Sequence, residues 1–181
     1  SYRQLIWAAD QRTFYRALGA QLAPKIQQKQ ELVEKSHGMD SILTLFVGTT
    51  LARDEANAAC GTHAFFTRDL AGLSTLPSWN STAADGMDAL KRWIVAYLEK
   101  TTFEISVPAL RDATLAPEGK TGLVVSTLFD YDLTKFMFDA GEYDALKKLA
   151  QETILRVLDQ SILPRLVERT EFAFCGTPLT I

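Results

Sequence analysis

The segment "SVPALRDATLAPEGKTGLVVSTLFDYD", from Ser106 to Asp132, contains the clearest pair of strands in the sequence. Just before its turn, β-branched and aromatic side chains alternate from Thr101 to Val107, a pattern typical of a strand. Pro117 and Gly119 then predict a turn, and the apolar run from Leu123 to Leu128 predicts a second strand. Because a single polar turn region joins the two strands, we expect them to be neighbours in one sheet.

Four further stretches have the composition of strands. Residues 41–51, with the sequence SILTLFVGTTL, carry apolar side chains on both faces, so we expect both faces of this strand to be buried in the interior of a sheet. The other three stretches are residues 2–9, 62–70 and 170–180.

Apolar residues at helical spacing predict helices between these strands. Asp10 is a good N-cap for a first helix, and Pro24 opens a second, largely polar one. Longer amphipathic helices are predicted from Met87 to Lys100 and from Glu142 to about Leu163, whereas residues 71–85 are expected to form a loop. The predicted fold class is therefore α+β, with a mixed, largely antiparallel sheet of about five or six strands and helices packed on one face.

Length and composition fit one ordinary globular domain. The chain has 181 residues, 47% hydrophobic residues and a formal net charge of −3. It therefore lacks the excess positive charge that is typical of proteins that bind nucleic acid. The longest apolar runs are far shorter than the roughly 20 residues that cross a bilayer, and no signal peptide opens the sequence. We expect a soluble, cytoplasmic protein that does not bind nucleic acid.

The sequence contains none of the motifs GxGxxG, P-loop, GxSxG or HExxH. His37 and His63 have no neighbouring residues that would complete a catalytic triad, and Cys60 and Cys175 lie outside any metal-ligand spacing. We therefore predict no catalytic residue and no metal site in this chain.

Asp130 and Asp132, which flank Tyr131 after the predicted strand, could be imagined as a pair of carboxylates for acid and base catalysis. Their position at the end of a strand favours a role in ending the strand and capping the next turn. Among the tryptophans, Trp7 and Trp93 fit core positions, whereas Trp79 lies in the predicted loop and could mark a contact surface.

Phenylalanine is the residue type that best suits an apolar binding site here. Five phenylalanines lie on or beside predicted strands, so they could either fill the core between sheet and helices or line an elongated apolar cavity. The candidate substrate-binding residues are Phe46, Phe65, Phe66, Phe103 and Phe129.

The turn between the paired strands resembles a turn in the substrate domain of phytoene-desaturase-like flavoproteins. That family is FAD-dependent and includes bacterial phytoene desaturases, carotenoid cis-trans isomerases and retinol saturases. The residues that match its Pro/Asp/Ala-Pro-x-Gly pattern are Pro108, Asp112, Ala116, Pro117, Glu118 and Gly119. Three further stretches are similar to the family in the same order: LIWAADQRTFYRAL, SILTLFVGTTL with Gly48, and VERTEFAFCGTPLTI with its Thr-Pro-Leu-Thr signature.

The resemblance implies a fragment of a flavoenzyme of the amine-oxidase-like architecture. Residues 1–20 would be the end of an FAD-domain strand and a connecting helix, residues 21–181 would be the substrate-binding domain, and the FAD-binding domain of the parent would be absent. FAD would act in the full-length parent by hydride transfer with a carotenoid, retinoid or other isoprenoid. The isolated chain is expected to hold no cofactor and to be inactive.

The resemblance also implies the partners of the chain: the missing FAD-binding domain of the same polypeptide and an apolar small molecule. Self-association through the apolar surface and peripheral membrane association of the parent stay open. The alternative function is a non-catalytic lipid-binding or protein-interaction module.

Overall fold

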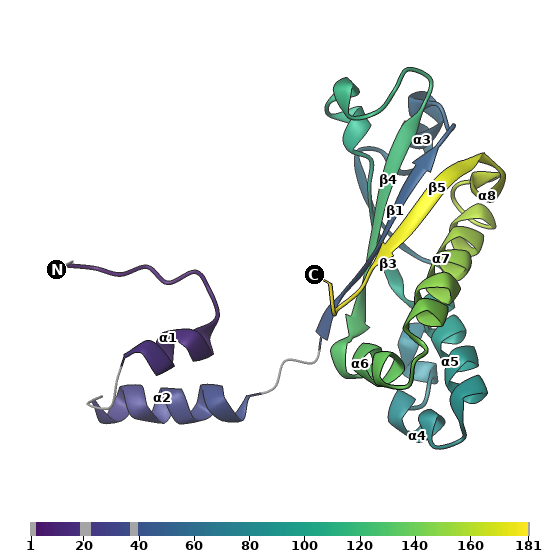
Figure 1. The fold of residues 1–181 in the computed structure, drawn as a ribbon. Helices are drawn as coiled ribbons and strands as arrows, with labels where there is room; N and C mark the ends of the chain where they lie inside the picture. The colour runs from purple at the N-terminus through teal and green to yellow at the C-terminus, as the bar shows by residue number, and fades with distance from the viewer. Residues whose placement is uncertain (1–2, 19–22, 37–39, 181) are drawn as a thin grey trace. The chain divides into compact units, whose positions relative to one another are not determined.

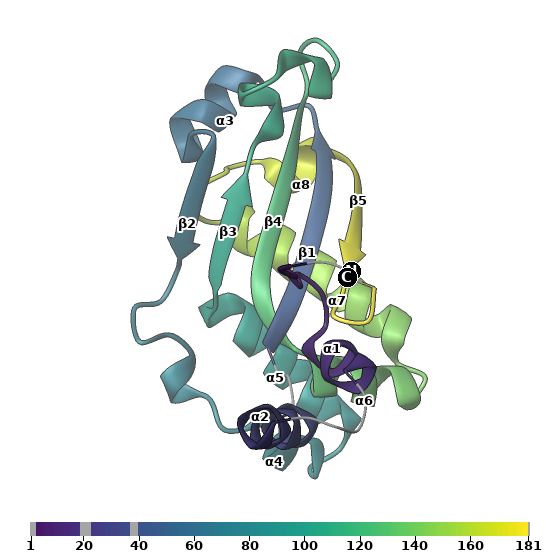
Figure 2. The same ribbon diagram turned by 90° about the vertical axis from the view of Figure 1, so that its left-hand side faces the viewer.

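The two strands predicted around the Pro117 turn lie next to each other in a five-stranded sheet of the computed structural model, which describes residues 3–18, 23–36 and 40–180 (Figure 1). The strands are β1 (Asp40–Thr49), β2 (His63–Thr67), β3 (Thr102–Ser106), β4 (Thr121–Asp130) and β5 (Thr170–Gly176). Their order across the sheet is β2-β3-β4-β1-β5, and each pairing is antiparallel (Figure 2). The predicted α+β class is confirmed.

The chain divides into two units, Ser1–Gly38 and Met39–Ile181, and the sheet belongs to the second. The helices of this unit are α3 (Arg53–Cys60), α4 (Trp79–Ala83), α5 (Met87–Lys100), α6 (Tyr131–Asp139), α7 (Tyr143–Asp159) and α8 (Leu166–Arg169). Three short 3-10 helices complete it: η1 (Gly72–Thr75), η2 (Pro108–Leu110) and η3 (Ala113–Leu115).

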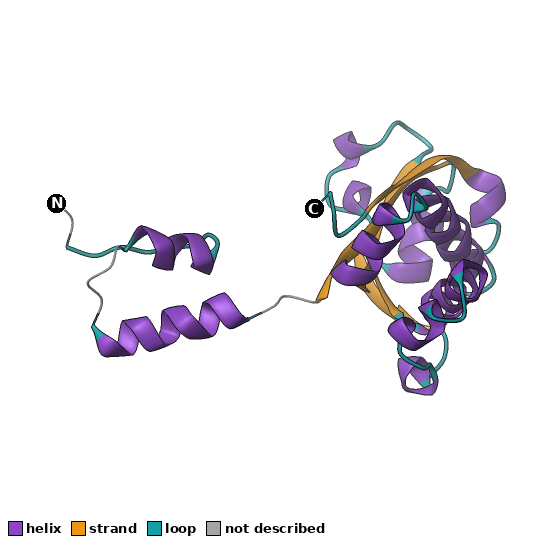
Figure 3. Cartoon of the chain, turned by 60° about the horizontal axis from the view of Figure 1, so that its bottom comes forward, coloured by secondary structure: helices purple, strands orange, loops and turns teal. Residues whose placement is uncertain are grey.

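The two long helices α5 and α7 pack on the same face of the sheet, which we call the covered face (Figure 3). Their apolar residues recur every three or four positions, so each helix buries one side against the strands. The core between sheet and helices includes Leu90, Ile94 and Leu98 of α5, Leu146, Ala150, Ile154 and Leu158 of α7, and Leu43, Leu45, Phe103, Ile105, Leu123, Val125 and Phe129 of the strands.

The opposite face of the sheet, which we call the open face, has no helical layer among the described residues of this unit (Figure 2). The sequence predicts a strand in the sheet interior with both faces buried, and β1 does lie between β4 and β5. One of its faces is fully buried, whereas the other is buried only in part, at Thr44 and Gly48. Ile42 is 41% exposed and Phe46 is only partly buried, whereas Leu43 and Leu45 are fully buried. Apolar side chains on both faces of β1 therefore do not mean that helices cover both faces.

The first unit contains α1 (Gln11–Ala17) and α2 (Pro24–Lys35). Asp10 is the N-cap of α1 as predicted: its carboxylate accepts from the Thr13 amide at 2.7 Å, which lowers the pKa of Asp10. The strand predicted at residues 2–9 is not present in the described residues 3–9, because a strand needs a neighbour and the unit has none among its described residues. Trp7 is accordingly 41% exposed and does not occupy the predicted core position.

The helices α3, α4 and α6 are not predicted from the sequence, and α4 lies within residues 71–85, which are predicted to form a loop. α3 and α4 have few apolar residues in their sequences, and α6 follows directly on β4. Asp130 caps α6 as predicted, with its carboxylate accepting from the Leu133 amide at 2.8 Å. The other carboxylate oxygen of Asp130 accepts from Nε1 of Trp79 at 3.1 Å. Trp79 packs partly buried against the core, so it ties α4 to α6 and is not an exposed loop residue.

Candidate functional site

The open face is the candidate functional site because large apolar side chains project from it, and the described residues of the unit Met39–Ile181 form no layer over them. Leu128, Phe172 and Phe174 are 61%, 59% and 56% exposed. Leu128 lies on β4 and the two phenylalanines lie on β5, with β1 between these strands, and the pairing registers place all three on one face of the sheet. An exposed apolar surface of this kind usually marks a site where a ligand or another protein surface binds.

Cross-strand pairs organise the open face into rows. Ile42 of β1 lies opposite Leu128 of β4, and two residues further along the strands Thr44 lies opposite Ser126. Phe46 then lies opposite Val124 and, on its other side, opposite Phe174 of β5. In the last row Gly48 lies opposite Gly122 and Phe172. Because a strand rises about 3.4 Å per residue, these rows span roughly 20 Å along the sheet.

A first apolar hollow lies at the end of the open face that is close to α6. Its volume is about 280 Å³. It is lined by the apolar residues Ile42, Phe65 and Leu128 and by the polar residues Thr102, Glu104, Ser126 and Thr127. Its apolar walls come from three different strands, so the hollow exists only because the sheet register brings these residues together.

A second apolar hollow, of about 340 Å³, lies nearer the other end of the open face. Phe46, Val124, Phe172 and Phe174 form its floor on the sheet. The rings of Phe46 and Phe174 are stacked, with centroids 4.9 Å apart. A further wall comes from Pro108, Ala109 and Leu115, which lie in and beside the two short helices that precede β4.

Gly48 leaves room for the Phe172 ring, which forms part of the floor of the second hollow. A Cβ atom at position 48 would lie 2.1 Å from Cε1 of Phe172, so any other residue would push the ring away. The glycine thus allows an aromatic ring to lie close against the β1 backbone.

The residues that match the family turn have structural roles next to the second hollow. Asp112 caps η3: its carboxylate accepts from the backbone amide and the hydroxyl of Thr114 at 2.9 and 2.7 Å, and these hydrogen bonds lower the pKa of Asp112. Gly119 has a φ of +73°, and the amide of Lys120 donates to the carbonyl of Pro117 at 3.1 Å. A glycine suits this turn because its backbone conformation strains other residues.

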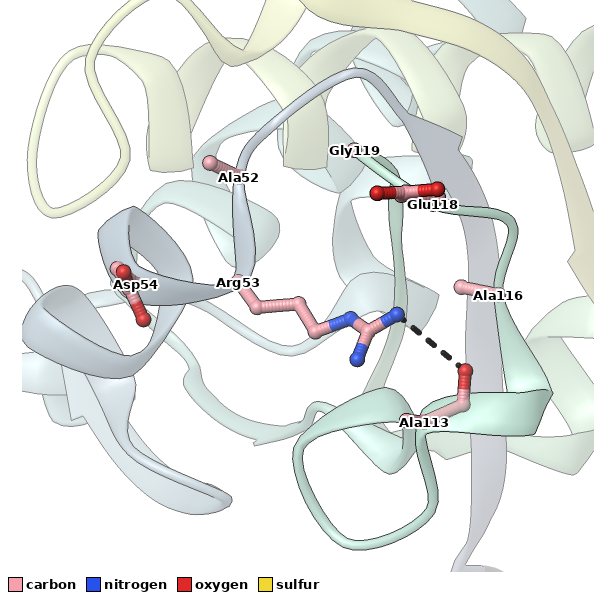
Figure 4. Close-up of a pocket in the computed structure, with 7 residues that line it drawn as sticks. All are labelled: Ala52, Arg53, Asp54, Ala113, Ala116, Glu118 and Gly119. Carbon is pink, nitrogen blue, oxygen red and sulfur yellow. Dashed lines mark hydrogen bonds between the residues drawn. The ribbon is translucent and has the colours of Figure 1, made fainter.

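A third hollow, larger and more polar, lies between the start of α3 and the same turn (Figure 4). Its volume is about 590 Å³, and Arg53, Ala116, Glu118 and Gly119 are among its lining residues. The guanidinium of Arg53 donates to the carbonyl of Ala113 at 3.4 Å. This contact links α3 to the turn, and we assign the hollow no ligand.

The five candidate phenylalanines divide between the two faces of the sheet. Phe46 and Phe65 lie on the open face and line the two apolar hollows. Phe103 and Phe129 lie on the covered face at 1% exposure each, where they fill the core. Phe66 is partly buried and packs against that core.

Five apolar residues that line the hollows of the open face are absent from the candidate set: Ile42, Val124, Leu128, Phe172 and Phe174. The signal for the two phenylalanines was present, because TEFAF alternates polar or small residues with aromatic ones as a half-exposed strand does. The sequence alone does not reveal the register between β1 and β5, which places these two phenylalanines on the same face as Phe46.

The titratable groups offer little for catalysis on the open face. Nε2 of His63 lies 2.9 Å from a carboxylate oxygen of Glu104, and both side chains are well exposed. Among the described residues, no group of three or more His, Cys, Asp or Glu side chains could hold a metal ion. His37 lies outside the described residues.

Cys175 is a buried thiol, 7% exposed, and burial raises its pKa from 9.0 to about 11. Between pH 9 and 11 the unfolded thiol loses its proton while the folded thiol keeps it, so stability falls as the pH rises through this range. We expect wild type to lose about 1–2 kcal/mol more than Cys175→Ala over this interval. Urea unfolding of both proteins at several pH values measures the difference, and parallel pH profiles would contradict it.

None of the helices in the described part of the chain is long and apolar enough to span a membrane.

Comparison with known proteins adds no assignment to this geometry: no protein-family model matches the chain, and no curated protein matches it.

Proposed function

We propose that this chain is the substrate-binding domain of an FAD-dependent oxidoreductase of the phytoene-desaturase-like type, acting on a long apolar isoprenoid. The observation that carries the proposal is the open face, an apolar surface of roughly 20 Å on a sheet whose other face is covered by α5 and α7. The covered face is already buried by helices, whereas an exposed apolar surface usually marks a site where a ligand or another protein surface binds.

The volumes of the two apolar hollows favour a binding site that is completed by another domain. Ligand pockets usually enclose about 300–1,000 Å³ and bury most of the ligand. The two apolar hollows have volumes of about 280 and 340 Å³ and are both open to solvent along the sheet. A ligand lying across both would be buried on one side only, and in our proposal another domain of the same polypeptide covers the other side.

In the proposal, the family resemblance identifies this covering domain as the FAD-binding domain. The 181 residues contain no GxGxxG motif, so this chain offers no glycine-rich turn for the pyrophosphate of a dinucleotide. In the parent enzyme the flavin would accept or donate the hydride. The residues of this chain would hold the isoprenoid chain, orient it and exclude water from it.

Flavin retention tests the proposal. The complete reading frame that contains this segment is expressed, and the absorption spectrum of the purified protein is recorded. We expect the bands of a bound flavin, and loss of flavin absorbance on adding an apolar isoprenoid under anaerobic conditions if the enzyme is a desaturase. A complete gene product that binds isoprenoid but no flavin would contradict the proposal and favour the non-catalytic lipid-binding module.

A further inference from the structure

The open face is bordered at one end by the segment that joins β3 to β4. Residues 107–120, which contain η2, η3 and the Pro117 turn, lie at the end of β4 away from α6 and project on the side of the sheet that faces away from α7 (Figure 1). Three apolar residues of this segment line the second hollow, whereas none of its residues lines the first. We call these three residues, Pro108, Ala109 and Leu115, the end wall.

Leu115 is the part of the end wall that is most accessible to a ligand. Its side chain is 62% exposed, whereas Ala109 is buried and Pro108 is half-buried. An apolar ligand that lies in the second hollow and extends toward the end wall therefore meets Leu115.

Backbone hydrogen bonds hold Leu115 in place. Its amide donates to the carbonyl of Asp112 at 3.1 Å, and the amide of Asp112 donates to the carbonyl of Pro108 at 3.1 Å. At the base of the segment Val107 is fully buried, and its amide donates to the carbonyl of Thr62 at 3.0 Å. A residue that limits the length of a ligand needs a supported backbone, and Leu115 has one.

The two apolar hollows lie along one path on the open face. Ile42 lines the first hollow, and Phe46 lines the second four residues further along β1, about 14 Å away by the rise of a strand. Between them the hydroxyls of Thr44 and Ser126 hydrogen-bond to each other at 3.0 Å, which lowers the cost of covering them with an apolar chain. A long apolar ligand can thus extend from the first hollow through the second to the end wall.

We propose that Leu115 is a stop for one end of the ligand and thereby sets the length of the apolar chain that the open face accepts. This inference rests on the proposed function and adds a specificity-determining residue to it. A ligand whose end lies against Leu115 has each of its bonds at a fixed distance from the end wall. In the parent enzyme, Leu115 would therefore determine which bond of the substrate lies beside the flavin.

The test uses geraniol, farnesol and geranylgeraniol, each longer than the one before by one isoprene unit. Each displaces the fluorescent dye anilinonaphthalene sulfonate from the chain, which gives its dissociation constant. The length preference is the dissociation constant of geraniol divided by that of geranylgeraniol. Comparing this preference between wild type and variants cancels the different water solubility of the ligands.

We expect Leu115→Ala to raise the length preference by roughly fivefold, because the smaller side chain makes room for the end of the longest ligand. Leu115→Trp should lower it by roughly fivefold, because the larger side chain shortens the path while geraniol still fits the first hollow. If Leu115 were only an apolar contact, the two changes would have the opposite signs, since alanine removes contact area and tryptophan adds it.

Leu70→Ala and Leu70→Trp are the matched controls, because Leu70 is 99% exposed and lines neither apolar hollow. Both should keep the length preference of wild type. Unfolding curves establish that each variant is folded, and Leu115→Phe replaces Leu115→Trp if the tryptophan variant is not.

Two further results would overturn the inference in different ways. If all three ligands bind and the length preference is the same in wild type and in both Leu115 variants, Leu115 is no stop while the apolar site stands. If none of the three ligands binds the chain or its full-length parent, the proposed function fails together with the inference.

Discussion

Replacing Phe103 or Phe129 by alanine is expected to destabilise the unit Met39–Ile181 by about 3–5 kcal/mol. Both side chains are 1% exposed in the core between the sheet and the helices, so each truncation leaves a cavity. The same change at Phe65, which is 70% exposed on the open face, is expected to cost less than about 1 kcal/mol. Urea unfolding followed by far-UV circular dichroism measures the three values.

The comparison is internally controlled because all three residues are phenylalanines on neighbouring strands of one sheet. Similar losses at Phe65 and Phe103 would mean that the open face is buried in solution. That result would contradict the division of the sheet into a covered face and an open face.

Phe174→Asp is expected to weaken binding of farnesol by roughly a hundredfold, because a carboxylate would have to lose its water against an apolar ligand. Phe174 is 56% exposed and stacks on Phe46 in the second hollow, so the change removes an apolar surface as well. The free energy of unfolding should change by less than about 1 kcal/mol, since the new charge stays in contact with water when no ligand is bound. Displacement of the fluorescent dye anilinonaphthalene sulfonate by farnesol measures the affinity of each variant for farnesol.

Leu70→Asp is the control for this variant. It introduces the same charge at a leucine that is 99% exposed and lies outside both apolar hollows. Its affinity for farnesol should equal that of wild type. A loss of binding in Leu70→Asp as large as that in Phe174→Asp would point to a nonspecific effect of charge and against the open face.

The hairpin-like pair β3 and β4 and the helices α5 and α7 could be predicted because their patterns are strong. A period of two and a Pro/Gly turn define the strands, and apolar residues every three or four positions define the helices. The helix predicted to about Leu163 ends at Asp159, a boundary error that periodicity alone does not prevent.

Other elements depend on contacts that a single sequence does not reveal. α3 has only alanines and one cysteine as apolar residues, so its pattern resembles that of a connection. The segment at residues 2–9 has strand composition, yet composition cannot supply the neighbouring strand with which it would pair.

The candidate site was predictable in residue type but not in placement. Phe46, Phe103 and Phe129 all lie on apolar strands, and nothing in their local sequences says which face carries helices. β4 illustrates the difficulty, because Leu123 and Val124 are adjacent apolar residues and only Leu123 is in the core. The face is decided by where α5 and α7 pack, which is a property of the whole fold.

The most direct test of the central claim, that the open face binds a long apolar ligand, is methyl-detected NMR of the chain titrated with farnesol. The account predicts shifts for the methyl groups of Ile42, Val124 and Leu128, which line the open face. It predicts none for Leu98 and Ile154, which lie in the core behind the sheet. Shifts confined to the core residues, or an unchanged open face at saturating farnesol, would contradict it.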